Sequence, residues 1–306
     1  MQVAVRVDLP PSPATPGDFE PLTSALRNSH ASAVAAVVYA ELPPSAAVQR
    51  SEWLPLTSAV EAAVRAADLK LIDILIVSKS TWWSLLCTEP SCCPREGTAR
   101  AIGCSAAAAA ATVAGLVALD DRAAVEAQLA GDAELKRREL EPHLEMAEHR
   151  VTRAVLNNGV ARLVQSDLDA LAEAARVRAG GQSLSAQTVP STHQALTPHE
   201  LARFGVALAD TAIRDEMWVA IDEGSMDAEQ LLRELLHRLP APYDAAPLFL
   251  LGWHQWRAGN GTVAGMAAER ALESDRGYSA ARLLLQAVRS GLDPRNTPRL
   301  RNPDTP

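Results

Sequence analysis

Four cysteines carry the strongest chemical signal in the sequence. Cys87, Cys92 and Cys93 stand close together, and Cys104 follows after a gap of ten residues. Zinc takes four tetrahedral thiolate or imidazole ligands, usually from two knuckles with two to four residues between cysteines. The first gap fits, but neighbouring side chains on an extended chain point in opposite directions, and no second knuckle or nearby histidine exists. Zinc at Cys87, Cys92 and Cys93 is therefore an alternative that the spacing does not favour.

The same thiols allow two other interpretations. A redox pair could form between Cys87 and either Cys92 or Cys93. Buried, unreactive thiols that stabilise a loop are the favoured interpretation. A catalytic cysteine needs a partner base, and no histidine lies between His30 and His143. The sequence thus leaves open whether the protein is an enzyme.

The elements before this loop alternate between strands and helices. Residues 3–7 alternate apolar and polar side chains, as a half-buried strand does, whereas residues 33–40 and Lys70–Ser78 are nearly continuous apolar runs. Amphipathic helical patterns separate these three strands, so parallel pairing with right-handed crossovers is expected. Residues 81–87 are predicted to return as an antiparallel strand. The predicted fold class is α/β: an N-terminal parallel-sheet domain followed by a mostly helical C-terminal region.

The ends of these strands predict a ligand site. Parallel sheets bind ligands outside the carboxyl ends of their strands, where this chain places Asp8 and Lys79. Trp82 and Trp83 on one strand put one indole on each face, so one packs in the core and the other can line a pocket. The predicted ligand-binding set is Asp8, Lys79, Trp82 and Trp83, although an ordinary loop role is favoured for any single strand-end residue.

The C-terminal third reads as paired helices. Residues 245–278 predict two helices joined at Gly259-Asn260-Gly261, with small residues at spacings that resemble a tetratricopeptide repeat. Trp253 and Trp256 lie on the first of these helices and are the predicted partner-binding residues. The predicted organisation begins with an α/β domain that carries the Trp/Cys loop (residues 1–118) and a helical middle segment (119–179). A linker (180–197) then leads to a helical region with the repeat-like hairpin (198–292) and a flexible tail (293–306).

Composition narrows the classes of partner. The chain of 306 residues has a formal net charge of −8, which argues against a nucleic-acid partner, because phosphate neutralisation needs a basic face. The N-terminus has no signal-peptide pattern, and the apolar run at residues 105–119 is too short and too alanine-rich to span a membrane. A cytoplasmic protein with no membrane partner is predicted.

The whole chain resembles a family common in actinobacteria, the domain of unknown function 4192. The residues that carry the resemblance are Arg6-Val7-Asp8-Leu9-Pro10, the motif from Trp82-Trp83-Ser84 through Cys87 and Cys92-Cys93-Pro94 to Glu96-Gly97-Thr98, Gly115-x-Val117, and Arg238–Tyr243 leading to Trp253 and Trp256-Arg257-Ala258-Gly259. Members usually begin some tens of residues earlier with a further strand, so the resemblance implies that this segment is missing here. It implies no activity.

Two functions are compatible with these patterns. The first is a cytoplasmic interaction or scaffold protein that docks a protein partner on its helical C-terminal region. The second is an enzyme or small-ligand binder with a site at the strand ends beside the loop from Cys87 to Cys93. The repeat-like hairpin and the lack of any recognised catalytic set favour the first.

Overall fold

The structure is a computed structural model. It describes residues 9–99, 126–179 and 195–300, apart from short gaps at 11, 29–30, 43–48, 80, 128 and 130–132. The chain forms two compact units, residues 1–119 with 289–293 (the N-terminal unit) and residues 120–288 with 294–306 (the helical unit). The strand predicted at residues 3–7, Asp8, Cys104 and most of the predicted linker lie outside the described residues.

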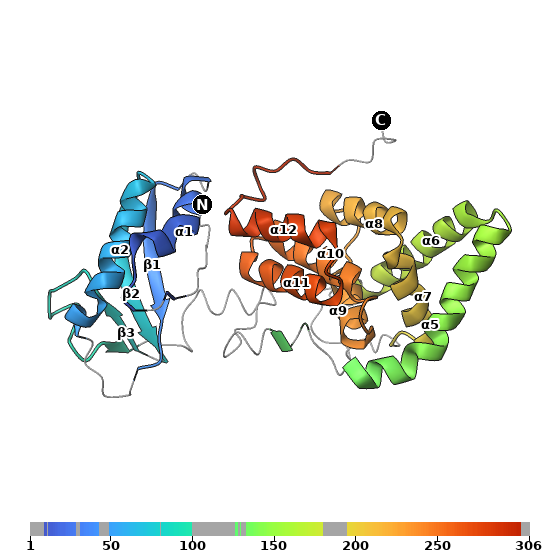
Figure 1. Ribbon diagram of the computed structural model, residues 1–306, viewed down its shortest axis with the longest axis horizontal. Coiled ribbons are helices and arrows are strands. Elements are labelled where there is room, and N and C mark those ends of the chain that lie inside the picture. The colour runs from blue at the N-terminus through green and yellow to red at the C-terminus, as the bar shows by residue number, and fades with distance from the viewer. Residues whose placement is uncertain are drawn as a thin grey trace, which may run out of the picture. The chain divides into compact units, whose positions relative to one another are not determined.

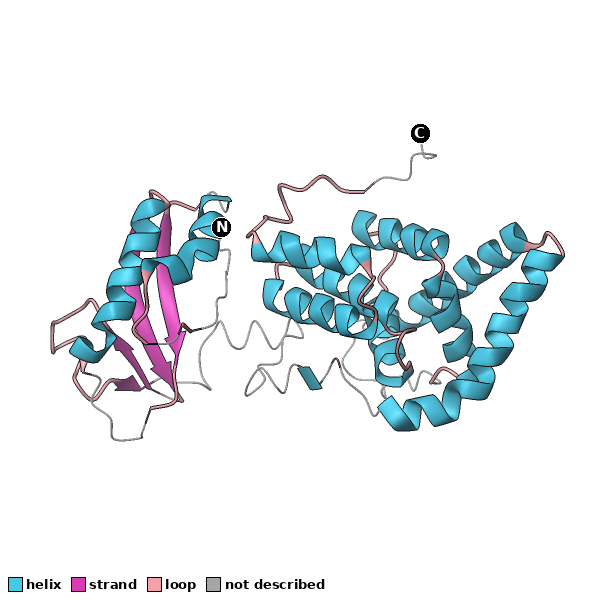
Figure 2. Ribbon diagram, in the orientation of Figure 1, coloured by secondary structure: helices cyan, strands magenta, loops and turns pink. Residues whose placement is uncertain are grey.

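The N-terminal unit is built on a mixed sheet whose strands follow one another in chain order (Figure 2). The strands are β1 (Ala33–Tyr39), β2 (Lys70–Ser78), β3 (Thr81–Ser84) and β4 (Thr98–Ala99). β1 and β2 pair in parallel, while β3 runs antiparallel to β2 and β4 antiparallel to β3. The predicted α/β class is confirmed, and so are the parallel pair and the antiparallel return, although β3 ends three residues earlier than predicted.

Helices cover one face of this sheet (Figure 1). They are the 3-10 turn η1 (Pro16–Phe19), α1 (Glu20–Asn28), the 3-10 turn η2 (Arg50–Trp53) and α2 (Leu54–Ala66). Val60 and Val64 of α2 are buried in one cluster with Ile74 and Ile76 of β2, which alternate with more exposed neighbours along the strand. Complete burial of each such side chain stabilises the fold by about 1.5–3 kcal/mol, so this face fixes the register of β2.

The helical unit consists of packed helices around a large aliphatic and aromatic core. Its helices are α5 (Ala133–Leu156), α6 (Val160–Ala179), α7 (Pro198–Ala209), α8 (Thr211–Glu223), α9 (Glu229–Arg238), α10 (Ala245–Arg257), α11 (Gly261–Ser274) and α12 (Ser279–Arg289). Thr197 caps α7 as its spacing to Glu200 predicts: Thr197 N–H donates to the Glu200 carboxylate, and Glu200 N–H donates to the Thr197 hydroxyl. The mostly helical C-terminal region is therefore confirmed.

The predicted helical hairpin is present as α10 and α11. Its helices approach closely at Gly252, where an added Cβ would lie 3.2 Å from the Ala267 Cβ and 3.3 Å from the Ala264 carbonyl oxygen. Small residues at these positions let the two backbones pack together. The likeness to a tetratricopeptide repeat stays a prediction.

A buried ion pair closes the core of the helical unit. Asp222 on α8 is fully buried, and its carboxylate accepts bonds from the Arg257 guanidinium at 2.5 and 3.0 Å and from the Trp253 indole N–H at 2.8 Å. Arg257 also lies over the rings of Trp253 and Trp256. These contacts tie α8 to α10 at a point where an unpaired charge would be strongly destabilising.

The same ion pair holds the end of the described chain. Arg257 donates to the carbonyl oxygens of Thr297 and Pro298, both at 2.9 Å, and Leu300 N–H donates to the Asp222 carboxylate at 2.6 Å. The sequence predicts a flexible tail from residue 293, whereas residues up to 300 are fixed by these bonds. The four prolines led to the prediction of a frayed tail because proline has no N–H to donate. The carbonyl groups of the tail can still accept bonds, and here Arg257 donates to them.

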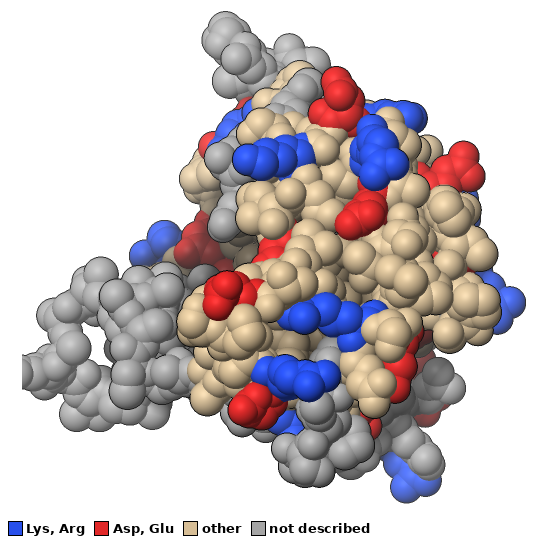
Figure 3. Space-filling view, turned by 90° about the vertical axis from the view of Figure 1, so that its left-hand side faces the viewer, with Lys and Arg blue, Asp and Glu red and all other residues tan. Residues whose placement is uncertain are grey.

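The face shown in Figure 3 has no large patch of side chains of a single charge. Basic and acidic side chains are interspersed there among uncharged residues. Among the described helices, none combines the length and the apolar composition needed to cross a bilayer.

Candidate metal centre

A tight turn brings the three cysteine sulfurs together. The carbonyl oxygen of Glu89 accepts bonds from the backbone N–H of both Cys92 (3.3 Å) and Cys93 (2.9 Å), so the chain is coiled here rather than extended. The sequence argument against zinc assumed an extended chain with side chains on opposite sides. That assumption is wrong, because Glu89 places both sulfurs on the side that faces Cys87.

The three sulfurs form one cluster. The Sγ atoms of Cys87 and Cys92 lie 3.2 Å apart, those of Cys92 and Cys93 lie 3.6 Å apart, and all three fall within 4.8 Å of one another. Among the described residues, no other group of cysteine, histidine or carboxylate ligands is so compact. Cys92 is exposed and the other two are half-buried, so the predicted burial of the thiols is wrong, whereas their lack of reactivity stays a prediction.

The close contacts also separate the thiols electrostatically. Contact with the Cys92 thiol lowers the pKa of Cys87, and the same contact raises the pKa of Cys92. Contact with Cys87 raises the pKa of Cys93 to about 12. These contacts therefore favour deprotonation of Cys87 over that of Cys92 and Cys93, and the three thiols titrate as one coupled group.

Cys87 is fixed to the sheet through β3. Its backbone N–H donates to the Ser84 hydroxyl at 2.8 Å, and that hydroxyl donates to the Asp73 carboxylate on β2 at 2.7 Å. Arg50 of η2 donates to the Cys87 carbonyl oxygen. The first sulfur of the cluster is thus positioned by regular elements, as a preorganised ligand should be.

The far side of the loop is fixed by Trp83 and Gly97. The Trp83 indole N–H donates to the Arg95 carbonyl oxygen at 3.2 Å. Gly97 has φ +85° and lies close to the Trp83 ring, since an added Cβ would come within 2.5 Å of that ring and of the Thr81 side chain. The loop can return to β4 only because residue 97 has no side chain.

Gly97→Ala is expected to destabilise the N-terminal unit by about 1–3 kcal/mol, because it adds backbone strain and forces Trp83 to move. The measurement is chemical denaturation of the full chain. Gly224→Ala is the matched control, since Gly224 has φ +79° but open space around its Cβ position. Equal losses for the two variants would show that contact with Trp83 contributes nothing.

The predicted ligand-binding residues are not gathered around the thiols. Lys79 is exposed in the turn between β2 and β3, and Cys87 is held at the opposite end of β3, about 10 Å of strand away. Trp83 is buried on the helix-covered face, while Trp82 is half-buried on the other face, as the alternation of a strand predicts. Asp8 lies outside the described residues.

The predicted partner-binding residues lie in the core of the helical unit. Trp253 is 8% exposed and Trp256 is 3% exposed, and their rings pack against each other at 4.9 Å between centroids. The structure gives them a packing role. The partner-binding prediction depended on exposed indoles, and both of these indoles are buried.

Sequence reasoning missed the residues that position the cluster. Asp73 interrupts the apolar run of β2, and Ser84 follows the two tryptophans directly, so a polar residue in an otherwise buried strand was the available signal. Nothing local marks Arg50, which lies 37 residues before the cysteine that it contacts.

Fold and loop together define the class: an α/β unit whose sheet carries a three-thiol loop, followed by a helical array. The chain belongs to the family described as domain of unknown function DUF4192, whose model matches residues 1–295. The resemblance seen in the sequence is thereby confirmed. Comparisons with curated proteins and with solved structures found no match.

Proposed function

We propose that this protein binds a thiophilic divalent cation of the zinc class through Cys87, Cys92 and Cys93. The observation that carries the proposal is the convergence of three sulfurs within 4.8 Å. A tetrahedral zinc ion with bonds of about 2.3 Å needs thiolate sulfurs about 3.8 Å apart. The distances of 3.2 and 3.6 Å between neighbouring sulfurs are close to this value, and small rotations of the cysteine side chains would remove the difference.

The anchoring of the loop supports the same proposal. Hydrogen bonds to the Ser84 hydroxyl and the Glu89 carbonyl, and one donated by Arg50, restrain all three ligand residues, so metal binding would cost little ordering entropy. Three protein ligands leave a fourth position for water, an external ligand or another protein group. A cytoplasmic location, which the sequence predicts, would keep the sulfurs reduced and available to the metal.

The test is metal content and thiol accessibility in anaerobically purified protein. We expect one zinc ion per chain and slow reaction of three thiols, with both properties lost in Cys87→Ser, Cys92→Ser and Cys93→Ser. Glu89→Gln is the control, because its carboxylate bonds to Ser91 and not to the sulfurs, so this variant should keep the metal. Cys104→Ser reports whether the fourth cysteine supplies the remaining ligand. Zinc-exposed protein that holds no metal and has freely reactive thiols would refute the proposal.

Docking of a protein partner on the helical unit is the second candidate function. Its support is a shallow pocket over α11 and α12, a surface that a protruding partner segment could fill. Loss of partner capture after charge reversal at the pocket would support this function, and unchanged capture would remove it.

A further inference from the structure

The turn between α5 and α6 forms an exposed apolar tip. Val155, Leu156 and Val160 are 56%, 76% and 41% exposed, although side chains of this type are normally buried. They stand together because α5 ends at Leu156 and α6 begins at Val160 (Figure 1). A cluster of large apolar side chains at a protruding turn marks an interaction site.

The same tip is cationic. Arg153 and Arg162 are exposed within one helical turn of it, and the sequence from 149 to 166 contains no aspartate or glutamate. Asp167, just beyond, is buried and already bonded to Arg150 and Arg203. In a chain of net charge −8, the tip is thus a local excess of positive charge on apolar surface.

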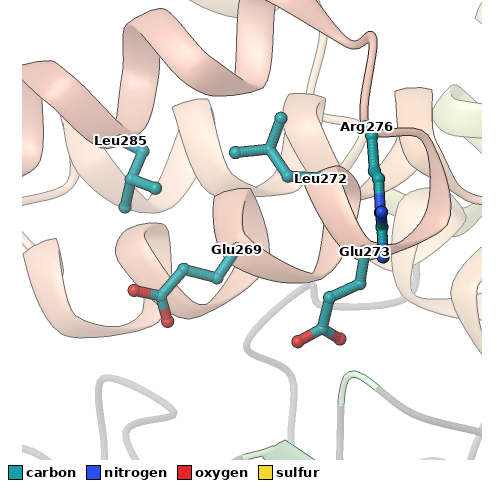
Figure 4. Close-up of a pocket in the computed structure, with 5 residues that line it drawn as sticks. All are labelled: Glu269, Leu272, Glu273, Arg276 and Leu285. Atoms are coloured by element: carbon teal, nitrogen blue, oxygen red, sulfur yellow. The ribbon is translucent and has the colours of Figure 1, made fainter.

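The helical unit also carries a pocket of opposite character. The pocket has a volume of about 320 Å³ and is lined by two leucines, two glutamates and one arginine, namely Leu272, Leu285, Glu269, Glu273 and Arg276 (Figure 4). Figure 4 shows both glutamate carboxylates on the same side of α11, pointing away from the two leucines. The pocket therefore combines an apolar floor with a rim on which carboxylates outnumber the guanidinium.

Tip and pocket lie at opposite ends of the helical unit. In Figure 1 the α5–α6 turn is at one extremity, and α11 and α12 are at the other. One helical unit therefore cannot place its tip in its own pocket. A second copy of the chain can, because it brings a convex cationic tip to a concave, acidic-rimmed pocket.

We propose that the α5–α6 tip of one copy docks in the α11–α12 pocket of a second copy. Leu156 enters between Leu272 and Leu285, and the tip arginines face Glu269 and Glu273. The contact joins two different surfaces, so it is head-to-tail and extends into short chains unless the rotation closes a ring. The surface involved is small, and we expect a dissociation constant of about 0.1 mM.

The first measurement is sedimentation velocity of the full chain over a concentration series at low and high salt. We expect the average mass of the wild-type protein to rise with concentration and to fall with salt, because salt screens exposed charges. Leu156→Ser should reduce association. Arg162→Glu should also reduce association. Its control is Arg176→Glu, which makes the same charge change on α6 about 21 Å further along the helix.

A charge exchange provides the decisive test. One variant carries Arg153→Glu with Arg162→Glu at the tip, and the other carries Glu269→Arg with Glu273→Arg at the pocket. Each alone opposes like charges and should associate at least about tenfold more weakly than wild type. In a mixture of the two variants, each tip meets a pocket of opposite charge on the other variant, so association should return.

Three results would overturn the proposal. The first is wild-type protein that stays monomeric throughout the series. The second is a mixture of the two variants that associates no better than either variant alone. The third is tip-dependent binding to phosphatidylcholine–phosphatidylserine vesicles without self-association, which would make an anionic membrane surface the occupant.

Discussion

Asp222→Ala will lower the free energy of unfolding of the helical unit by about 3–5 kcal/mol, because removing one partner of a buried ion pair leaves the other charge buried and unpaired. The Arg257 guanidinium, only 13% exposed, would keep its charge and lose both carboxylate bonds. The Trp253 indole N–H and the Leu300 N–H would lose their acceptor as well. Four donors depend on this one carboxylate, which is why we expect a loss of this size.

Chemical denaturation of the full chain measures this loss, with the transition of the helical unit followed separately from that of the N-terminal unit. Asp215→Ala is the control on the same helix, because Asp215 also pairs with an arginine but is 52% exposed. An exposed pair of this kind contributes at most about 1 kcal/mol. If the two variants lose similar stability, the buried pair is not the contact that closes the core.

If the proposed site holds zinc, free metal at a thousand times its dissociation constant will stabilise the N-terminal unit by about 4 kcal/mol, because the site exists in the folded loop and not in the unfolded chain. The thiol loop connects β3 to β4, and its ends are fixed by Ser84 and Gly97. Metal bound to Cys87, Cys92 and Cys93 would cross-link this connection, so the whole edge of the sheet should melt later.

Calorimetry with and without a chelator measures the shift. Glu89→Gln should respond as the wild type does, whereas Cys92→Ser should show no response to zinc. A shift of equal size in Cys92→Ser would mean that zinc acts elsewhere on the chain, and the proposed site would then be wrong.

The regular elements could be predicted because their signals are local. The apolar run of Lys70–Ser78 matches β2 residue for residue, and the alternation along the next strand correctly predicted that Trp82 and Trp83 lie on opposite faces. The capping box at Thr197 was likewise visible over four residues. In each case the deciding interaction lies within a few positions along the chain.

The candidate site could be predicted only in its composition. The gathering of Cys92 and Cys93 beside Cys87 depends on one carbonyl, that of Glu89, accepting two backbone bonds, and no residue pattern specifies this. β4 has two residues, too few to show a period. Asp222 and Arg257 are 35 positions apart, so the burial of that pair was not visible either.

The attachment of residues 294–300 to Asp222 and Arg257 has a consequence for the order of events during synthesis. Residues 294–300 are synthesised after the helices that they contact, yet they supply bonding partners for a charge pair on those two helices. Until Thr297 and Pro298 have emerged from the ribosome, Arg257 has its carboxylate partner but not these two carbonyls. The helical unit therefore reaches its final packing only after residues 294–300 have emerged, whereas β1 and β2 can pair at an earlier stage of synthesis.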